Sequence, residues 1–415
     1  MRSMRLPITY SNIVNTLLFL FPIGILNLKI SGDLILLLLI PMGIYTVFTD
    51  KINPFKQSKL KLLSRLCVAY FSVVILSIVV SHKGFELLHF SSRTAYFLFA
   101  PLIALTIYKA NINFNRLIFS MKLSLILVGV VIYYQYLTKD YNEIDWILSR
   151  GILPILTTIM LTFSWVNINH ENKYNFSLTL VSSILALNII TLGDGRSAFL
   201  SLIILSVLFI FLNAKSLVNK YRYKILISVL ILTCTSFLLT HSNLTNRFST
   251  AIEFLSLFSK NGYSTEDLHT SIKGKSDETT NIRLAMYKGG LLAAKDRPIF
   301  GHGYRNTTAP ASKFVGNKKL AIQIAKHSHL HNTFINALVY GGAIALLTTL
   351  ALLLFPLKKF WQSLRAKNNT KYAILGTLLM SSYIILSATN GMLSGTLENS
   401  FFVFFLSIFL PKVIK

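Results

Sequence analysis

Long apolar runs separated by short polar segments make up most of the chain. A run of roughly 17–21 apolar residues can cross the hydrocarbon core of a bilayer as one helix, whereas a membrane β-barrel would show short alternating segments. The pattern therefore predicts an all-α, polytopic membrane protein with about twelve transmembrane helices. The predicted spans lie near residues 12–29, 32–48, 66–82, 94–109, 117–137, 151–168, 176–193, 197–213, 225–241, 332–355, 372–390 and 400–414.

One long polar interruption divides this series of spans. We expect residues 1–241 to hold transmembrane helices 1–9, residues 242–331 to form a large, partly helical loop, and residues 332–415 to hold helices 10–12. The loop is the only candidate for a separately folded unit. Arg2 and Arg5 precede the first apolar run without a small-residue cleavage site, so we expect a retained first helix and no signal peptide.

Helical signals appear in the second half of the loop. Acidic and hydroxyl residues at 277–280 favour a helix start, and 281–295 (NIRLAMYKGGLLAAK) has the pattern of an amphipathic helix. We expect this helix to lie on the membrane surface or over the helix bundle, and to end near Pro298. A tight turn at 301–304 (GHGY) and a second helix near 311–326 follow. Two glycines alone are a weak signal for a phosphate-binding loop.

The distribution of basic residues gives an orientation. With the N-terminus in the cytoplasm, the inside segments hold 21 Lys and Arg and the short outside segments hold 6. This asymmetry predicts that both termini are cytoplasmic and that the 242–331 loop is periplasmic. The 13 basic residues of the loop do not contradict the rule, because long loops are translocated largely regardless of charge.

Composition narrows the class of protein further. Only 13% of the residues are charged, 53% are hydrophobic and the mean hydropathy is +0.58. A soluble protein has about 25% charged residues, so a soluble enzyme of this length is excluded. The formal net charge of +26 is explained by the orientation rule and by contact with membrane lipids, and we expect no nucleic-acid partner. Cys67 and Cys234 both fall in apolar runs and form no metal-binding or disulfide framework.

Two arginines are candidates for anion binding. Arg196 sits in a very short outside turn, and Arg283 lies in the amphipathic segment of the loop. Either could simply extend toward the membrane surface or bind ordinary anionic lipid. Alternatively, the two guanidinium groups bind one lipid-linked diphosphate, since each can donate two parallel hydrogen bonds to phosphate oxygens.

The histidines at the end of the loop are the candidates for acid–base chemistry. His329 or His331 could act as a general base, and the alternative is that both are histidines of a wet loop. His327 and His331 have the i, i+4 spacing of a helical metal pair, but no carboxylate lies nearby to complete a zinc site, so we expect no metal.

Other catalytic motifs are missing from the sequence. It contains no P-loop, no GxSxG, no HExxH and no Asp-x-Asp pair of the kind found in metal-dependent sugar-nucleotide sites. The outside acidic residues are scattered, and any of them could be a catalytic carboxylate. They are Asp33, Glu86, Asp140, Glu143, Asp145 and Glu398.

The layout resembles the O-antigen ligase family of bacterial membrane enzymes, which have a dozen helices and one large periplasmic loop late in the chain. The motifs that carry the resemblance are GRSA at 195–198, RLAMYKGG at 283–290 with Pro298 and GHG at 301–303 after it, and HLHN at 329–332 with Gly341-Gly342 after it. The His-Asn signature is shared with O-antigen polymerases and protein O-oligosaccharyltransferases, so it marks the superfamily better than the reaction.

The resemblance implies a glycan transfer without metal or other cofactor. The donor would be a glycan on undecaprenyl diphosphate, and the acceptor would be a sugar hydroxyl of lipid A–core. By position, Arg196 and Arg283 would hold the diphosphate and His331 would activate the acceptor, with His329 as the weaker candidate. The enzyme would lie in the bacterial inner membrane with its active site facing the periplasm.

Two alternatives remain at this point. The first is an O-antigen polymerase or protein O-oligosaccharyltransferase, which would use the same donor with a different acceptor. The second is a flippase for lipid-linked glycans, which should carry ionisable groups along a path through the bundle. Lys122 is the one ionisable residue clearly inside a predicted span, which disfavours the flippase.

Overall fold

The computed structural model describes residues 8–28, 31–81, 85–139, 143–166, 168, 172–193, 196–213, 224 and 278–414. Most of these residues are helical, with no strand among them. The helices are α1 (Ile8–Asn27), α2 (Ser31–Asp50), α3 (Ser58–Ser81), α4 (Phe85–Ser92), α5 (Ala95–Lys109), α6 (Phe114–Thr138), α7 (Ile152–Ser164), α8 (Lys173–Leu192), α9 (Arg196–Asn213), α13 (Glu278–Asp296), α14 (Thr308–Lys313), α15 (Lys318–Ala325), α16 (Thr333–Arg365), α17 (Thr370–Ser387) and α18 (Thr396–Val413).

Ten of these helices are long and apolar enough to cross a membrane, and α7 is a shorter apolar helix of 13 residues. The all-helical, multi-pass membrane architecture expected from the sequence is therefore confirmed. Eleven of the twelve predicted spans coincide with helices α1–α3, α5–α9 and α16–α18, while the ninth, at 225–241, lies outside the described residues.

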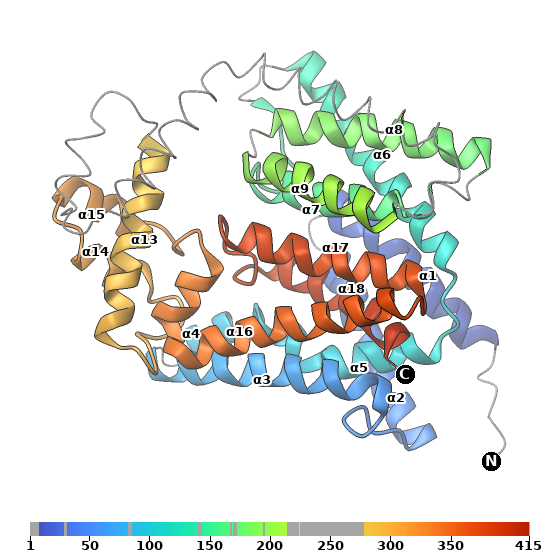
Figure 1. The fold of residues 1–415 in the computed structure, drawn as a ribbon, viewed down its shortest axis with the longest axis horizontal. Coiled ribbons are helices and arrows are strands. Elements are labelled where there is room, and N and C mark those ends of the chain that lie inside the picture. The colour runs from blue at the N-terminus through green and yellow to red at the C-terminus, as the bar shows by residue number, and fades with distance from the viewer. Residues whose placement is uncertain are drawn as a thin grey trace.

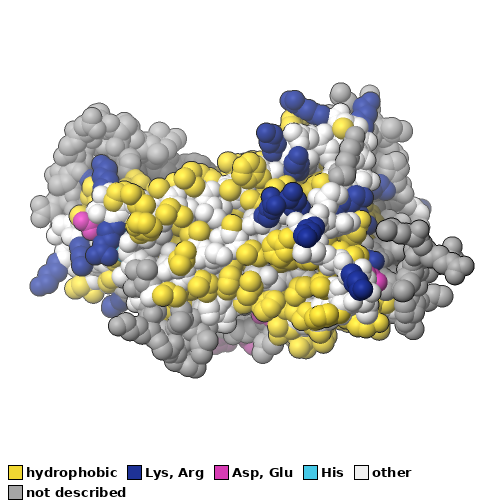
Figure 2. Space-filling view, turned by 90° about the horizontal axis from the view of Figure 1, so that it is seen from below, with side chains coloured by type: hydrophobic (Ala, Val, Ile, Leu, Met, Phe, Trp, Pro, Cys, Tyr) yellow, Lys and Arg dark blue, Asp and Glu magenta, His cyan; other side chains and the backbone are white. Residues whose placement is uncertain are grey.

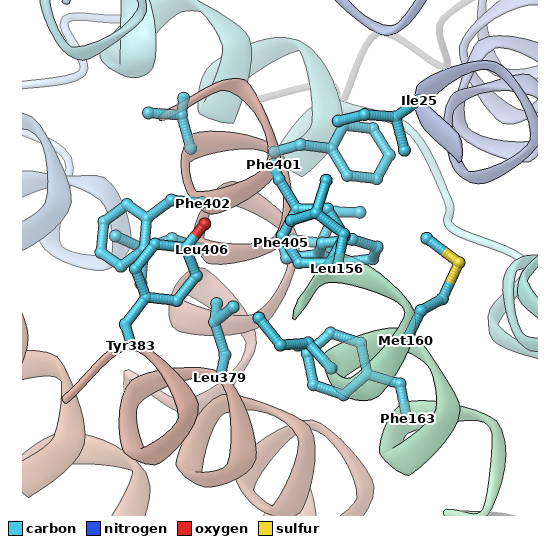
Figure 3. Close-up of a cluster of buried hydrophobic side chains, with 14 of the residues drawn as sticks. Ile25, Leu156, Met160, Phe163, Leu379, Tyr383, Phe401, Phe402, Phe405 and Leu406 are labelled. Atoms are coloured by element: carbon cyan, nitrogen blue, oxygen red, sulfur yellow. The ribbon is translucent and has the colours of Figure 1, made fainter. Parts of the chain in front are cut away.

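The centre of the bundle is built around α18, whose phenylalanines are buried on all sides. Figure 3 shows Phe401, Phe402 and Phe405 between side chains of α1, α7 and α17. The Phe405 ring lies 5.2 Å from Phe163 of α7, and the Phe402 ring lies 4.7 Å from Tyr383 of α17. Such aromatic contacts add to the close packing that holds membrane helices together.

The outer surface of the bundle suits a lipid environment. Figure 2 shows one face with hydrophobic side chains across its middle and Lys and Arg gathered toward its two ends. Large apolar side chains such as Leu76 of α3 and Leu347 of α16 are 66% and 65% exposed. An apolar belt between basic ends is the surface expected where hydrocarbon meets headgroups.

The two ends of the bundle differ. Figure 1 shows α13, α14 and α15 beside the first turns of α16, at what we call the histidine end because His327–His331 lead into α16 there. The start of α1 and the end of α18 lie at the opposite end. The histidine end is therefore the end at which the late loop is folded.

The described part of the loop has a small core of its own. Apolar side chains of α13, α14, α15 and the start of α16 form a second buried cluster, separate from the main core. The amphipathic helix predicted at 281–295 is thus confirmed as α13, and it packs over other parts of the chain. A Cβ at Gly290 would lie 2.7 Å from Ile335 and 2.8 Å from Leu330, which explains why this contact face of α13 carries a glycine.

The second loop helix differs from the sequence expectation. The prediction of one helix near 311–326 was wrong, because the segment forms two helices, α14 and α15. The chain turns at 314–317, and the side chain of Asn317 accepts a hydrogen bond from the backbone N–H of Leu320. An asparagine cap of this kind starts a new helix where the apolar pattern alone suggests continuation.

The two glycine motifs of the sequence meet in space. Helix α16 is broken at Gly341 and Gly342, and residues 298–304 fill the break; we call this contact the glycine junction. His302 N–H donates to the carbonyl of Val339 at 2.7 Å, and Gly303 N–H donates to that of Tyr340 at 2.8 Å. Ala343 N–H in turn donates to the carbonyl of Pro298 at 2.8 Å. The loop thus pairs backbone groups that a broken membrane helix would otherwise leave unpaired.

Glycine is required at this junction by both conformation and space. Gly301, Gly303 and Gly342 have φ values of +67°, +99° and +62°. A Cβ at Gly301 would lie 2.5 Å from the backbone nitrogen of Gly341, and one at Gly342 would overlap the carbonyl of Ile299. Because the junction uses the N–H groups of His302 and Gly303, the GHG turn does not present them to a phosphate.

Candidate functional site

The HLHN motif places His331 immediately outside a capped helix. The side chain of Asn332 accepts hydrogen bonds from the N–H groups of Phe334 and Ile335, both at 3.0 Å, and so caps α16. Its Nδ2 donates to the carbonyl of Ala388 at 2.9 Å. His331 has φ +50°, a left-handed conformation that costs a non-glycine residue energy and is often found at functional sites.

The three histidines of this segment lie close together. The ring of His331 is 4.5 Å from that of His329 and 5.5 Å from that of His327. His329 Nδ1 is 3.0 Å from the hydroxyl of Ser328. A Cβ at Gly391 would lie 3.0 Å from His329 Nε2, so the glycine makes room for this ring. His327 is exposed, whereas His329 and His331, the histidine pair, are partly buried.

Burial and positive surroundings keep the histidine pair neutral. Desolvation is the largest cause that lowers the pKa of His329, to about 4, and that of His331, to about 3. Nearby positive groups lower both further: Arg283 acts on both rings, and Arg305 acts on His329. Both imidazoles therefore have a free lone pair at neutral pH.

Helix α13 brings Arg283 and Tyr287 to the histidine pair. These residues are one helical turn apart, so they share a face of α13. The hydroxyl of Tyr287 donates to the carbonyl of His331 at 3.0 Å. Burial raises the pKa of Tyr287, which keeps that hydroxyl protonated, and the charge of Arg283 partly offsets the shift. The arginine expected from the sequence and both histidines thus lie at one place.

Hydrogen bonds of Ser197, the residue after Arg196, connect the start of α9 to the start of α16. Ser197 Oγ accepts from Asn390 Nδ2 at 2.9 Å, and the carbonyl of Asn390 accepts from Thr333 Oγ1 at 2.9 Å. The first turn of α9 and the first turn of α16 therefore meet at one loop, residues 388–395. Arg196 is not among the charges that act on the histidine pair, so its link to the site runs through this loop.

A further group of charged residues adjoins the site. Arg305 acts on the pKa of His329, and Arg93 and Glu398 act on that of Arg305. Neither arginine stands out from the sequence pattern, and Glu398 is there only one of several scattered acidic residues. The one signal for Arg305 is its position directly after the glycine turn, and its neighbours come from distant parts of the chain.

The described residues at this end of the bundle do not form a metal site. Within the described ranges, no group of three or more His, Cys, Asp or Glu side chains is arranged to hold a metal ion. What the site does offer is a neutral imidazole pair beside fixed guanidinium groups. Such an arrangement can take a proton from a hydroxyl and stabilise a negatively charged leaving group.

Comparison with known proteins agrees with this geometry. Residues 181–350 match the family model described as O-Antigen ligase, which confirms the resemblance of this segment to the O-antigen ligase family. Arg196, Arg283 and the histidine pair all lie inside the matched segment. Members of this ligase and polymerase superfamily are glycosyltransferase-like enzymes.

A relative from Haemophilus influenzae shows that the similarity extends beyond this segment. This "Uncharacterized protein" is 24% identical over 398 residues, covering 91% of this chain and 95% of the relative. The similarity therefore includes the helices before residue 181, where the sequence offered no motif.

Proposed function

We propose that this protein acts as an O-antigen ligase and transfers a glycan from undecaprenyl diphosphate to a sugar hydroxyl of lipid A–core. The transfer completes lipopolysaccharide and inverts the anomeric centre. His331 is the general base, and Arg283 and Arg196 hold the diphosphate. His329 supports His331 through ring contact and is the second candidate for the base.

One observation carries this proposal. Arg283 of α13 and the histidine pair before α16 come from separate parts of the chain. The hydrogen bond from Tyr287, one turn after Arg283, to the carbonyl of His331 brings them to one end of the bundle. A cation next to the histidines disfavours their protonated form. The arrangement is favourable for catalysis if the cation binds the anionic leaving group while the neutral imidazole accepts a proton.

The chemistry follows from these positions. His331 takes the proton of the acceptor hydroxyl as its oxygen attacks the anomeric carbon of the donor sugar. The bond from that carbon to the diphosphate oxygen breaks, and undecaprenyl diphosphate leaves with the electron pair. A positioned base contributes roughly 10²–10⁴-fold to such a rate. The bound diphosphate also raises the pKa of His331, because its negative charge offsets that of Arg283.

The arginines act on the leaving group. Negative charge grows on the diphosphate as the glycosidic bond breaks, and fixed donors are worth roughly 3–4 kcal/mol each at such a charge. The backbone that carries Arg283 is held in place because α13 packs closely through its glycine face. The backbone that carries Arg196 is held in place because the next residue, Ser197, accepts a hydrogen bond from Asn390.

The orientation proposed for the protein agrees with its shape. The inner membrane is the compartment in which lipid-linked glycans meet lipid A–core. The start of α1 and the end of α18 share the end away from the histidines, which supports cytoplasmic termini and a periplasmic active site.

The experiment uses a strain that lacks its own ligase. Arg283→Ala, Arg196→Ala and His331→Ala are each expressed, and the lipopolysaccharide is separated on a gel. We expect the wild type and the control Arg297→Ala, whose exposed side chain lies just after α13, to restore the O-antigen ladder. We expect the three site variants to lose it while reaching the membrane in normal amount.

Other outcomes would replace the proposal. A normal ladder from all three site variants would exclude these residues from the reaction. Purified protein that lengthens the glycan on its lipid carrier, with no transfer to core, would indicate a polymerase. Movement of donor across vesicles without a new glycosidic bond would indicate a flippase.

A further inference from the structure

Arg305 is held in place by the glycine junction. It follows Gly303 and Tyr304, and the Tyr304 N–H donates to the carbonyl of Ser77 in α3 at 3.2 Å. Arg305 itself has φ +61°, so its backbone is left-handed like that of His331. Two of the five non-glycine residues with positive φ in the described ranges thus lie around the histidine pair. Strain that the surrounding fold maintains is a marker of functional positions.

The side chain of Arg305 is half-buried and points toward another arginine. Its Nη2 donates to the carbonyl of Ser394 at 3.2 Å. Its guanidinium carbon lies 6.0 Å from the centre of the Phe90 ring, and that of Arg93 lies 5.9 Å from the same ring. The charge of Arg93 adds to burial in lowering the pKa of Arg305. Two like charges are therefore held close to one aromatic ring.

The negative charge at this place is smaller than the positive charge. Glu398 is the one carboxylate, among the described residues, that acts on Arg305. It is 9% exposed, and its Oε2 has no hydrogen-bond partner among them. Its side chain folds back against Gly395 at the start of α18. The single carboxylate of Glu398 lies at the start of α18. It does not balance the charges of both guanidinium groups, so the net charge here is positive.

Each guanidinium near the Phe90 ring has one nitrogen engaged: Arg305 Nη2 donates to Ser394, and Arg93 Nη2 lies 3.1 Å from His89 Nε2. The buried Nε of Arg305 has no hydrogen-bond partner among the described residues. The N–H groups point outward in the plane of the guanidinium, where they can form paired hydrogen bonds with phosphate oxygens. An anion here would also lie near His329, because Arg305 donates to Ser394, and a Cβ at Gly391 would meet both Ser394 Oγ and His329 Nε2 within 3.1 Å. Arg283 reaches the histidine pair from α13, whereas Arg305 reaches it from the glycine junction. The site therefore has a second cationic wall.

We propose that Arg305 and Arg93 form a second anion subsite beside the histidine pair, and that it binds a phosphate group carried by one of the two glycolipid substrates. The inference rests on the proposed function, which supplies both substrates. A phosphate on the acceptor sugar and the second phosphate of the donor share the same oxyanion chemistry. If the phosphate belongs to the acceptor sugar, this subsite determines which acceptor is chosen. If it belongs to the donor, the subsite is part of diphosphate binding.

The test compares Arg305→Gln with Arg305→Lys and with the exposed control Arg297→Gln. Glutamine keeps the non-glycine backbone strain but removes the charge, and lysine keeps the charge. Initial rates of glycan transfer are measured with the phosphorylated acceptor and with the same acceptor after phosphatase treatment. For a phosphate on the acceptor, we expect Arg305→Gln to raise the acceptor KM by about 10- to 100-fold, the size of a lost charged hydrogen bond.

The dephosphorylated acceptor separates the two phosphate sources. If the acceptor supplies the phosphate, its removal weakens the wild type as much as the substitution does, and Arg305→Gln loses nothing more. If the donor supplies it, Arg305→Gln raises the donor KM and phosphatase treatment changes nothing. In both cases Arg305→Lys recovers part of the loss. Equal behaviour of Arg305→Gln and Arg297→Gln toward both substrates would overturn the subsite.

A binding measurement keeps this inference separate from the proposed reaction. Wild type and Arg305→Gln in detergent are titrated with the phosphorylated glycolipid, its dephosphorylated form and undecaprenyl diphosphate. Phosphate-dependent binding that only the wild type shows would support the subsite even if no glycan transfer were detected. Identical binding by both proteins would reject it even if transfer were observed.

Discussion

The glycine junction and the histidine pair lie at the same end of the bundle and pack on the same helix, yet they use their polar groups in opposite ways. At the junction, the N–H groups of His302 and Gly303 are paired with backbone carbonyls of α16. At the histidine pair, by contrast, the ring of His331 makes no hydrogen bond to any described residue. The junction is therefore closed, whereas His331 keeps its ring nitrogens available.

This difference separates structure from chemistry among the motifs of the loop. The glycines are needed because a Cβ would overlap backbone and because their φ values are positive. The histidines are held neutral by burial and by arginines, at a cost that packing alone would not require. Substitutions in the two regions should therefore affect different measurements.

The largest effect is expected from Gly342→Ala at the junction. Alanine at φ +62° is strained, and its Cβ would overlap the carbonyl of Ile299, so we expect a loss of about 2–5 kcal/mol of folding free energy. Gly151→Ala is the control, because nothing lies within 4 Å of a Cβ there. The melting temperature in detergent and the yield of monodisperse protein measure the effect. Similar melting of the two variants would mean that the junction is not a structural requirement.

The next largest effect is expected from His331→Gln, and it should appear in activity alone. Loss of the base should slow transfer by about 10²–10⁴-fold. Folding should be nearly unchanged, since the ring donates to no described group. His327→Gln, at an exposed ring, should stay within about twofold of the wild type, the range of ordinary surface substitutions. A large drop in melting temperature for His331→Gln would instead make this histidine part of the architecture.

A third prediction uses pH to distinguish the regions. The histidine pair has folded pKa values of about 4 and about 3, whereas an unfolded histidine titrates near about 6.5. Between pH 6.5 and 4 the unfolded chain binds protons that the folded chain does not. Stability should therefore fall as pH drops through that window, by at most about 1.4 kcal/mol per pH unit and histidine.

The double variant His329→Gln/His331→Gln checks this pH dependence. Its melting temperature should change less than that of the wild type between pH 7 and pH 4.5. Above pH 6.5 the histidine pair should contribute no pH dependence to the melting temperature of either protein. An equal loss in both proteins would assign the acid sensitivity to other residues.

The sequence predicted most of the membrane architecture because long apolar runs have few alternatives. It predicted the α13 helix from a periodic apolar face, for the same reason. It missed the division between α14 and α15, because that division depends on one asparagine cap rather than on apolar pattern. It also treated GHG and Gly341-Gly342 as separate motifs, since nothing in the sequence states that one segment fills a break in the other.

The candidate site was only partly accessible from sequence for a similar reason. Arg283 and the histidines could be singled out by residue type and family resemblance. The surroundings of Arg305 depend on contacts between the glycine junction, Phe90 and α18, which are far apart in the chain. Such a group is assembled by tertiary structure alone, and no local spacing predicts it.

The smallest expected effect tests a direct hydrogen bond between α13 and the histidine pair. Tyr287→Phe removes the donor to the carbonyl of His331 but keeps the ring, so α13 should still pack. A neutral hydrogen bond is worth about 0.5–1.5 kcal/mol, so we expect transfer to slow by about 2- to 10-fold. Tyr174→Phe, on α8 and 69% exposed, is the matched control and should change nothing. If Tyr287→Phe were as active as this control, His331 would be held in its left-handed conformation by the Asn332 cap alone, and α13 would contribute Arg283 but no positioning.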